Sequence, residues 1–257
     1  RYFARIAKVN SKEPEKTCSG SPAINGRTGQ RVRVVRVIRR SGKPDEAGDP
    51  HPLGRVRVKF FPQQGKAYLA FYKPFDILCQ FTPEPGTDKG TLAQFGFPSD
   101  VYAVGRLDAD SEGLLLLSDD ARMNSRLLDP KNEHSRTYLA QVENVPSPAA
   151  IEKLATGVDI KGHWTLPAKV MLVKEEPQLP ERAKPIRFRK NIPTAWLKVT
   201  ITEGKNRQVR RMTAAVGHPT LRLVRVAIGA LELESLGLQP GEWRQLTDEE
   251  IAKAFQW

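Results

Sequence analysis

Residues 105–113 are Gly-Arg-Leu-Asp-Ala-Asp-Ser-Glu-Gly, and residues 114–117 are four consecutive leucines. Four leucines in a row, bounded by turn residues, indicate a short buried β-strand. The acidic loop that precedes them is therefore attached to a rigid element. Asp108 in this loop is a candidate for chemistry, whereas clusters of Asp and Gly are also common in solvated turns.

Three further segments have distinctive sequences. Phe71-Tyr72-Lys73-Pro74-Phe75-Asp76 precedes the acidic loop, and Arg136-Thr137-Tyr138-Leu139-Ala140-Gln141-Val142 follows it. The third is Glu203-Gly204-Lys205-Asn206-Arg207-Gln208-Val209-Arg210-Arg211-Met212. Together with the acidic loop, these segments resemble the motifs of the RsuA/RluE-like pseudouridine synthases, in the same order along the chain. The resemblance covers about residues 66 to 246 and is greatest to the type E synthases, which act on large-subunit ribosomal RNA.

The resemblance implies an activity. Such a synthase isomerises a uridine in RNA: it breaks the N1 glycosidic bond, rotates the uracil and rejoins it through C5. A type E enzyme would act on uridine 2457 of 23S rRNA. The reaction involves no redox change and no net hydrolysis, so no cofactor is expected. The chain has no P-loop or dinucleotide motif, which agrees with this expectation. No metal site is expected either, because its histidines, His51, His134, His163 and His218, lack ligand spacing.

The resemblance also implies catalytic residues. Asp108 would be the catalytic carboxylate, acting on C1′ as a nucleophile or on the C2′ proton as a base. A carboxylate in a water-poor pocket needs a cation to keep it ionised, and the resemblance assigns this role to Arg210. Tyr138 would stack on the extruded uracil, although a strand tyrosine considered alone is more often a core residue. Residues 110–112 are expected to hold the loop's shape through hydrogen bonds to backbone donors.

Basic residues near these motifs are expected to bind RNA. The resemblance implies that Arg106 contacts the RNA as the nucleotide swings out. Arg207 and Arg211 share a helix face with Arg210, which suits a phosphate-binding surface or, alternatively, a solvated basic stripe. The opposite face, with Val209, Met212 and Val216, is expected to be buried. The remaining predicted RNA-binding residues are Lys73, Arg222 and Arg225, which would add affinity rather than sequence specificity.

Charge is distributed unevenly along the chain. The net charge is +12. Residues 1–66 contain 16 basic and 5 acidic side chains, whereas the remainder contains 25 basic and 24 acidic ones. A polyanion such as ribosomal RNA is the expected partner. Residues 1–65 are rich in Pro, Gly and charge, and we expect a disordered basic extension, or a short strand around Val32 and Val34, with no counterpart of the S4-type domain of related synthases.

Residues 66–257 form the expected catalytic domain. Strands are predicted at 68–72, 196–202 and 221–228, from apolar runs and from alternation of apolar and polar residues. Helices are predicted at 121–128 after Asp119 or Asp120, at 148–154 after Ser147, and from Asn206 to Val216. Strands and short helices alternate irregularly, so we expect an α+β fold with a mixed, largely antiparallel sheet. The resemblance implies the pseudouridine synthase fold, with two subdomains, flanking helices and a central RNA-binding cleft.

Several other properties bound the class of protein. No long apolar segment is present and the first residues do not form a signal peptide, so a cytoplasmic location without membrane contact is expected. Cys18 and Cys79 are too few and too distant to predict a disulfide framework. The resemblance suggests a monomer. Alternatives are a noncatalytic ribosome-associated RNA-binding protein, a synthase for a different rRNA or tRNA uridine, and a nucleoside or glycoside hydrolase that uses Asp108 with Glu112.

Overall fold

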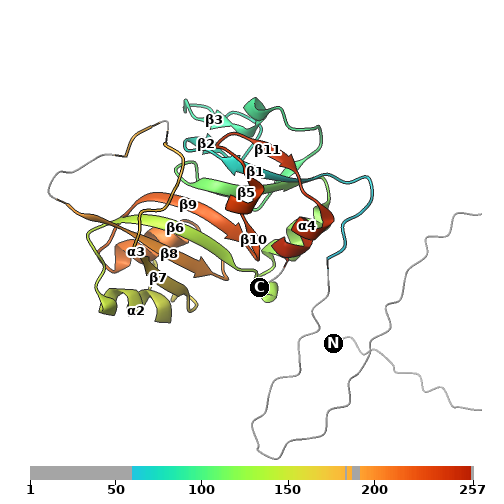
Figure 1. Ribbon diagram of the computed structural model, residues 1–257. Coiled ribbons are helices and arrows are strands. Elements are labelled where there is room, and N and C mark those ends of the chain that lie inside the picture. Colours follow the sequence, from blue (N-terminus) through green and yellow to red (C-terminus); the bar gives the residue numbers. More distant parts are fainter. Residues whose placement is uncertain (1–59, 183, 187–191, 256–257) are drawn as a thin grey trace, which may run out of the picture. The chain divides into compact units, whose positions relative to one another are not determined.

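The computed structural model describes residues 60–182, 184–186 and 192–255 (Figure 1). The expectations for residues 1–59 lie outside this range. Within it, one β-sheet contains nine strands, seven of them in the order β11-β1-β5-β9-β6-β8-β7. These seven strands are β1 (Tyr68–Lys73), β5 (Glu112–Ser118), β6 (Arg136–Glu143), β7 (Lys169–Val173), β8 (Thr194–Ile201), β9 (Thr220–Ile228) and β11 (Trp243–Gln245).

Shorter elements complete the sheet and cover it. β4 (Tyr102–Val104) pairs with β5, and β10 (Leu231–Glu232) pairs with β9. β2 (Ile77–Leu78) and β3 (Gly90–Thr91) form a separate two-stranded sheet. The helices are α1 (Ala121–Leu128), α2 (Pro148–Thr156), α3 (Gln208–Ala215) and α4 (Asp248–Ala254), with 3₁₀ turns at Leu92–Phe95, Pro130–Asn132 and Glu234–Leu236. β5 and β9 run parallel while the other pairs of the large sheet are antiparallel, which confirms the predicted α+β class.

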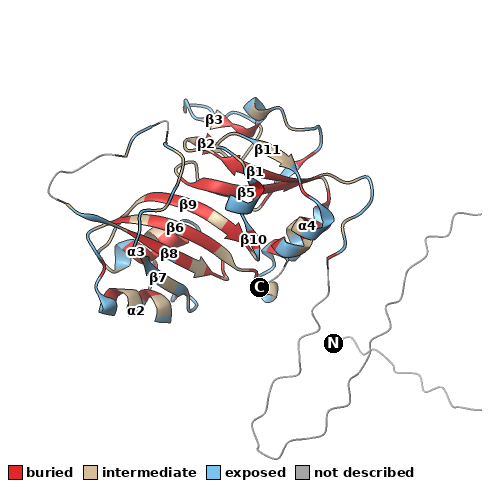
Figure 2. Ribbon diagram, viewed as in Figure 1, coloured by how far each residue is buried: buried red, intermediate tan, exposed pale blue. Residues whose placement is uncertain are grey.

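The four leucines form the buried strand that the sequence predicts, because β5 is covered on both faces of the sheet. Leu115 and Leu117 belong to the core cluster that includes Val209 and Met212 of α3. Leu114 and Leu116 belong to the opposite cluster, with residues of α1 and α4. Successive side chains of a strand point to opposite faces, so an unbroken apolar run is what a central strand requires. Figure 2 shows β1 and β5 buried and β7, at the sheet edge, largely exposed.

Helix starts follow the predicted caps in two of three cases. The side chain of Asp120 accepts a hydrogen bond from Arg122 N at the start of α1, and Ser147 does the same for Ala150 N in α2. The third prediction is wrong: α3 begins after Arg207, not Asn206, and its cap makes no side-chain hydrogen bond. Arg207 lies in the left-handed region, with φ 53°, so the helical backbone conformation starts only at Gln208.

Asp120 also connects α1 to the sheet. It accepts hydrogen bonds from Tyr68 Oη (2.5 Å) and from Arg122 Nη2 (2.6 Å). The Arg122 side chain is the main cause of a lowered pKa of Asp120, about 2. Because this pKa is depressed in the folded state, the ionised carboxylate stabilises the fold above the unfolded pKa. The stabilisation is lost as the pH falls through about 2.

We therefore expect the Asp120→Asn variant, which keeps a capping oxygen, to unfold with a free energy about 2 kcal/mol lower than the wild type at pH 7. The difference should shrink steadily between about pH 4 and pH 2. Urea unfolding of both proteins at several pH values measures it. A difference that stays constant over this range would show that the charge of Asp120 is not its cause.

Candidate active site

A cleft of about 920 Å³ opens at the acidic loop. It lies where the loop before β5 meets β6, β9 and the turn before α3. Asp108, Tyr138, Arg207 and Arg225 all line it, together with Arg106 at the rim. The cleft thus brings together residues of the acidic loop, β6, the turn before α3 and β9, which are spread over residues 106–225 of the chain.

The backbone of the acidic loop is anchored on both sides of Asp108. Leu107 is buried in the core, and its N–H donates to Cys79 Sγ. Ser111 N donates to Asp108 O at 3.0 Å, and Asp76 N donates to Ala109 O at 2.8 Å. The side chain of Asp108 remains 32% exposed and faces the cleft. A fixed backbone with an accessible carboxylate is the arrangement that a reaction at a bound ligand needs.

Among the residues that the structure describes, Arg207 is the cation that forms an ion pair with Asp108. Its Nη1 lies 3.6 Å from Asp108 Oδ2. The same guanidinium donates two hydrogen bonds to Asp110, from Nη1 to Oδ1 at 2.9 Å and from Nη2 to Oδ2 at 2.7 Å. Partial burial alone would raise the pKa of Asp110, but the hydrogen bonds from Arg207 and the charge of Arg210 outweigh it, so that pKa is lowered. Hydrogen bonding to Asp110 raises the pKa of Arg207.

Arg210 does not form the ion pair with Asp108 that we expected. Its Nη2 donates to the backbone oxygen of Asp110 at 2.6 Å and its Nη1 donates to Thr220 O at 3.1 Å. Its Nε lies 3.4 Å from Asp110 Oδ2. The physical reason is position: Arg210 lies in the first turn of α3 and its guanidinium is bonded to backbone oxygens, whereas Arg207 precedes the helix and its guanidinium reaches both carboxylates. Arg210 therefore supports the loop, and Arg207 approaches the carboxylate.

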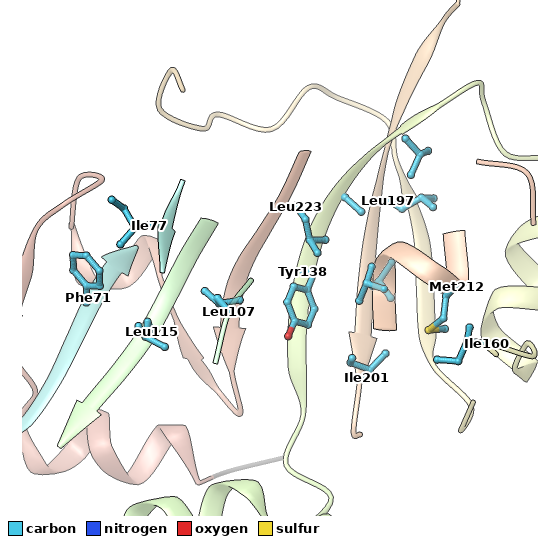
Figure 3. Packing of buried hydrophobic residues seen from close by; sticks show 14 of the residues in the cluster. Phe71, Ile77, Leu107, Leu115, Tyr138, Ile160, Leu197, Ile201, Met212 and Leu223 are labelled. Atoms are coloured by element: carbon cyan, nitrogen blue, oxygen red, sulfur yellow. The ribbon is translucent and has the colours of Figure 1, made fainter. Parts of the chain in front are cut away.

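Tyr138 is one of the residues that line the cleft. It is 8% exposed and belongs to the core cluster that includes Leu107 and Leu223. Figure 3 shows these side chains in a row along one face of the sheet, from Phe71 of β1 at one end to Met212 of α3 at the other. Tyr138 is thus both a core residue and a cleft residue, which reconciles the two interpretations of its sequence position.

The turn before α3 is held by two side chains of the third motif, Glu203 and Gln208, to which we assigned no role of their own from the sequence. Glu203 is buried and accepts hydrogen bonds from Gln208 Nε2 at 2.7 Å and from Leu166 N at 2.8 Å. Gln208 Oε1 in turn accepts from Lys205 N at 2.9 Å. These bonds close the turn of residues 203–208 and fix the left-handed Arg207. The available signal was an acid and an amide five residues apart, on either side of a Gly-Lys-Asn turn.

Comparisons with known proteins agree with this geometry. A family model described as RNA pseudouridylate synthase matches residues 67–215. The chain belongs to this family. A ribosomal large subunit pseudouridine synthase E from Xanthomonas campestris pv. campestris is 54% identical to this synthase over 172 residues, which are 67% of this chain and 91% of that protein.

Two further comparisons extend the similarity over most of the chain. A ribosomal large subunit pseudouridine synthase E from Vibrio vulnificus is 43% identical over 238 residues, 90% of this chain and 97% of that protein. A crystal structure of a pseudouridylate synthase matches this synthase with a TM-score of 0.60 and 28% identity, over 77% of this chain and 75% of that one. The family and fold expected from the sequence motifs are confirmed.

Lys73 of the synthase does not fit the RNA contact that we predicted. Its side chain is fully buried. Nζ donates to the backbone oxygens of Pro74 and Ile77, both at 2.8 Å, and to Ala109 O at 3.4 Å. Burial lowers its pKa to about 8. Lys73 therefore ties the end of β1 to the acidic loop, one residue after Asp108, from inside the protein.

The Lys73→Met variant should be destabilised by about 2 kcal/mol at pH 7, because three buried carbonyl groups lose their donor. In the wild type the pKa of Lys73 is about 8 in the folded state and 10.5 in the unfolded state, so the unfolded state binds more protons between these values. The free energy of unfolding therefore rises as the pH rises from 8 towards 10.5. The deficit of Lys73→Met should therefore widen by about a further 2 kcal/mol between pH 7 and pH 10. Chemical denaturation of both proteins across this range measures it, and a deficit that narrows would contradict the burial effect.

Arg222 is a second correction. It is buried and forms an ion pair with Glu112, with Nη2 donating to Oε2 at 2.7 Å and Nε to Oε1 at 3.0 Å. Its Nη2 also donates to Pro180 O at 2.9 Å. A guanidinium already occupied in this way cannot also hold a phosphate. Glu112 and Asp110 have arginine side chains as their main partners, where we had predicted backbone donors.

The other predicted RNA-binding residues lie in varied places. Arg106 is exposed at the cleft. Arg211 is half-buried and its Nη2 donates to Asn206 Oδ1 at 2.6 Å, outside the cleft lining. Arg225 lines the cleft but is buried. Val209 and Met212 form the buried face of α3 as predicted, whereas Val216 is only partly buried.

The described residues contain neither a metal-ligand cluster nor a membrane-spanning helix. Among them, no group of three or more His, Cys, Asp or Glu side chains is placed to hold a metal ion. In the same ranges, no helix is long and apolar enough to cross a membrane.

Proposed function

We propose that this synthase isomerises a uridine of large-subunit ribosomal RNA, and that its target is uridine 2457 of 23S rRNA. The support is the identity to two relatives named large-subunit synthase E, 54% and 43%. We further propose that it works as a monomer in the cytoplasm. One chain supplies Asp108, Tyr138, Arg207 and Arg225 to one cleft, so no second copy is needed to complete the site.

The proposal gives Asp108 the role of catalytic carboxylate. The single observation that carries this role is an accessible carboxylate on a fixed backbone, 3.6 Å from the Arg207 guanidinium and in the same cleft as Tyr138. A nearby cation keeps a carboxylate ionised when RNA displaces water from the cleft. We assign that role to Arg207. We assign to Arg210 the positioning of the loop, through its hydrogen bond to Asp110 O.

The chemistry then needs little else from the protein. The C1′–N1 bond breaks with its electron pair going to uracil N1. Asp108 either attacks C1′ and forms an ester that is later displaced, or removes the C2′ proton and later returns it. The ring rotates, C5 bonds to C1′, the C5 proton is lost and N1 takes up a proton. Tyr138 provides the aromatic face on which the extruded base stacks during these steps.

RNA binding is assigned to basic groups at and near the cleft that are not fully buried. Arg106 is exposed at the cleft, and Arg211 is a half-buried residue of α3 outside the cleft lining. Contacts of this kind to phosphates contribute affinity that falls with salt concentration. Lys73 and Arg222 are excluded from this role, because their cationic groups are buried and bonded within the protein.

The alternative functions receive less support. A hydrolase of the proposed type would need Glu112 as a second carboxylate near a water. Glu112 is buried in its ion pair with Arg222, so it is not available for that role. A noncatalytic RNA-binding protein would not require an accessible Asp108 beside Arg207, in the same cleft as Tyr138.

Mapping of pseudouridine in ribosomal RNA, from cells with and without the gene, tests the proposed function. We expect one large-subunit position to lose its pseudouridine in the deletion strain and to regain it when the gene is restored. With purified protein, release of tritium from C5 of labelled uridine should be greater with a 23S transcript than with a 16S one. A lost signal in tRNA or 16S rRNA instead would contradict the target, and no lost signal would contradict the activity.

A further inference from the structure

Arg225 has an unusual combination of burial and unused hydrogen-bonding capacity. Its side chain lines the cleft, yet the residue is only 3% exposed. Nε donates to Leu114 O at 2.7 Å. Nη2 is buried and has no hydrogen-bond partner, and no carboxylate forms an ion pair with Arg225 among the described residues. The Arg225 guanidinium therefore lies at the cleft with at least one hydrogen-bond donor, Nη2, unused.

Arg222 shows what a satisfied buried arginine on the same strand looks like. Three residues earlier on β9, its guanidinium is neutralised by Glu112 and bonded to Pro180 O. The two arginines differ in their partners, not in their burial. Leaving a buried charge without a partner is costly, so such a group usually has a functional partner that the free protein lacks.

The sheet places Arg225 between the catalytic loop and Tyr138. On one side it pairs with Gly113, which directly follows the acidic loop and Glu112. On the other side it pairs with Tyr138 across the antiparallel β6 and β9. Gly113 permits this approach, because a Cβ atom there would lie 2.3 Å from Arg225 O, and its φ is 106°. Directly paired residues of antiparallel strands point to the same face, so Arg225 and Tyr138 share the cleft wall.

The missing partner must be a small acceptor that enters the cleft. Backbone phosphates of RNA bind at exposed sites, whereas Arg225 is buried next to Tyr138, with which it pairs across β6 and β9. An extruded uracil brings two carbonyl oxygens into that position, and a planar guanidinium can donate to one of them in the plane of the ring. The acceptor becomes stronger during the reaction, since the electron pair released from the C1′–N1 bond is delocalised onto the uracil oxygens.

We propose that Arg225 is a catalytic residue that donates a hydrogen bond to a carbonyl oxygen of the target uracil and stabilises the uracil anion after the glycosidic bond breaks. The inference rests on the proposed function. Bond making and breaking stay as described above, since Arg225 keeps its proton throughout. A donor that strengthens as charge develops lowers the barrier to bond cleavage, and one that holds the free base keeps it in the cleft while it rotates.

Single-turnover kinetics with saturating full-length protein and a 23S transcript provide the test, with Arg225→Lys and Arg225→Met. The rate constant should fall about 10²- to 10³-fold in Arg225→Met and less in Arg225→Lys, as expected for loss of one donor to a developing anion. The dissociation constant for RNA should stay within about twofold. Arg126→Met, which removes a charge from the exposed side of α1, is the control and should leave both quantities unchanged.

A different pattern would overturn the proposal. If Arg225 contacts a phosphate instead, Arg225→Met should bind RNA more weakly, with a slope of log affinity against log salt that is smaller by about 1, and its single-turnover rate at saturation should equal that of the wild type. A rate in Arg225→Met equal to that of the wild type would also overturn it. If the wild type itself forms no pseudouridine in the same assay, the proposed function fails instead, so the two failures are distinguishable.

Substrate analogues keep the test decisive if Arg225→Met does not fold. Transcripts with 2-thiouridine or 4-thiouridine at the target replace one carbonyl oxygen with sulfur, a weaker acceptor. One of the two should slow the wild type, and the same substitution should have little further effect in Arg225→Lys, because both changes remove one interaction. Strictly additive effects of substrate and protein changes would show that Arg225 does not contact either oxygen.

Discussion

The Asp108→Asn synthase should form pseudouridine at least about 10⁴-fold more slowly than the wild type, because the amide is neither a nucleophile nor a base. Binding of the 23S transcript should change by less than about twofold, because the substitution is isosteric and removes no cation. The backbone bonds that anchor the loop, from Ser111 N to Asp108 O and from Asp76 N to Ala109 O, do not involve the side chain. Tritium release from C5 and filter binding measure the two quantities.

Asp110→Asn is the matched control. Asp110 is a carboxylate of the same loop, but it is bonded to Arg207 by two hydrogen bonds and to Arg210 by charge. We expect a smaller loss, about 10- to 100-fold, through misplacement of Arg207 and of the loop. If Asp110→Asn were the inactive variant and Asp108→Asn remained active, the catalytic carboxylate would be the other residue and the proposed assignment would be wrong.

The Arg222→Met synthase should lose about 3–5 kcal/mol of unfolding free energy, because it leaves the carboxylate of Glu112 buried without its partner. Glu112 and Arg222 are 3% and 9% exposed at their side chains, so water cannot replace the lost contact. The Nη2 bond to Pro180 O is lost as well. Urea denaturation of the two proteins at neutral pH provides the measurement.

A double variant separates the ion pair from other effects. Replacing both residues, Glu112→Met with Arg222→Met, removes the buried charge together with its partner and should recover most of the stability. RNA affinity and its salt dependence, measured on the double variant, should equal those of the wild type. If the Arg222→Met protein were as stable as the wild type and bound RNA more weakly and with a smaller salt dependence, Arg222 would contact a phosphate, as we first predicted.

Much of the fold could be predicted from local patterns. The leucine run, the alternation of β8 and the caps Asp120 and Ser147 each depend on a few neighbouring residues, and each element formed where predicted. We did not predict α4, although its capping box of Thr247 and Glu250 was a usable signal. The edge strands β7 and β11 have weaker patterns, because a strand with one exposed face and few residues carries little periodicity.

Site residues were harder to assign by role. Arg207, Arg210, Arg222 and Arg225 are chemically identical, and their spacing indicates only a basic helix and a basic strand. Their functions differ because of their partners. Arg207 forms an ion pair with Asp108, Arg210 donates a hydrogen bond to Asp110 O in the loop, and Arg222 neutralises Glu112. These partners come from segments about one hundred residues away, so no local pattern could separate them.

The sequence by itself determined the family, the buried strand beneath the acidic loop, and Asp108 and Tyr138 as the residues to examine, since motif identity and apolar periodicity are local properties. Only the tertiary structure decided that Lys73 and Arg222 are internal supports and that Arg225 faces the cleft with a donor to spare. Burial and ion pairing depend on which strands pair in the sheet. The pairing of β9 with both β5 and β6 therefore decides what Arg222 and Arg225 contact.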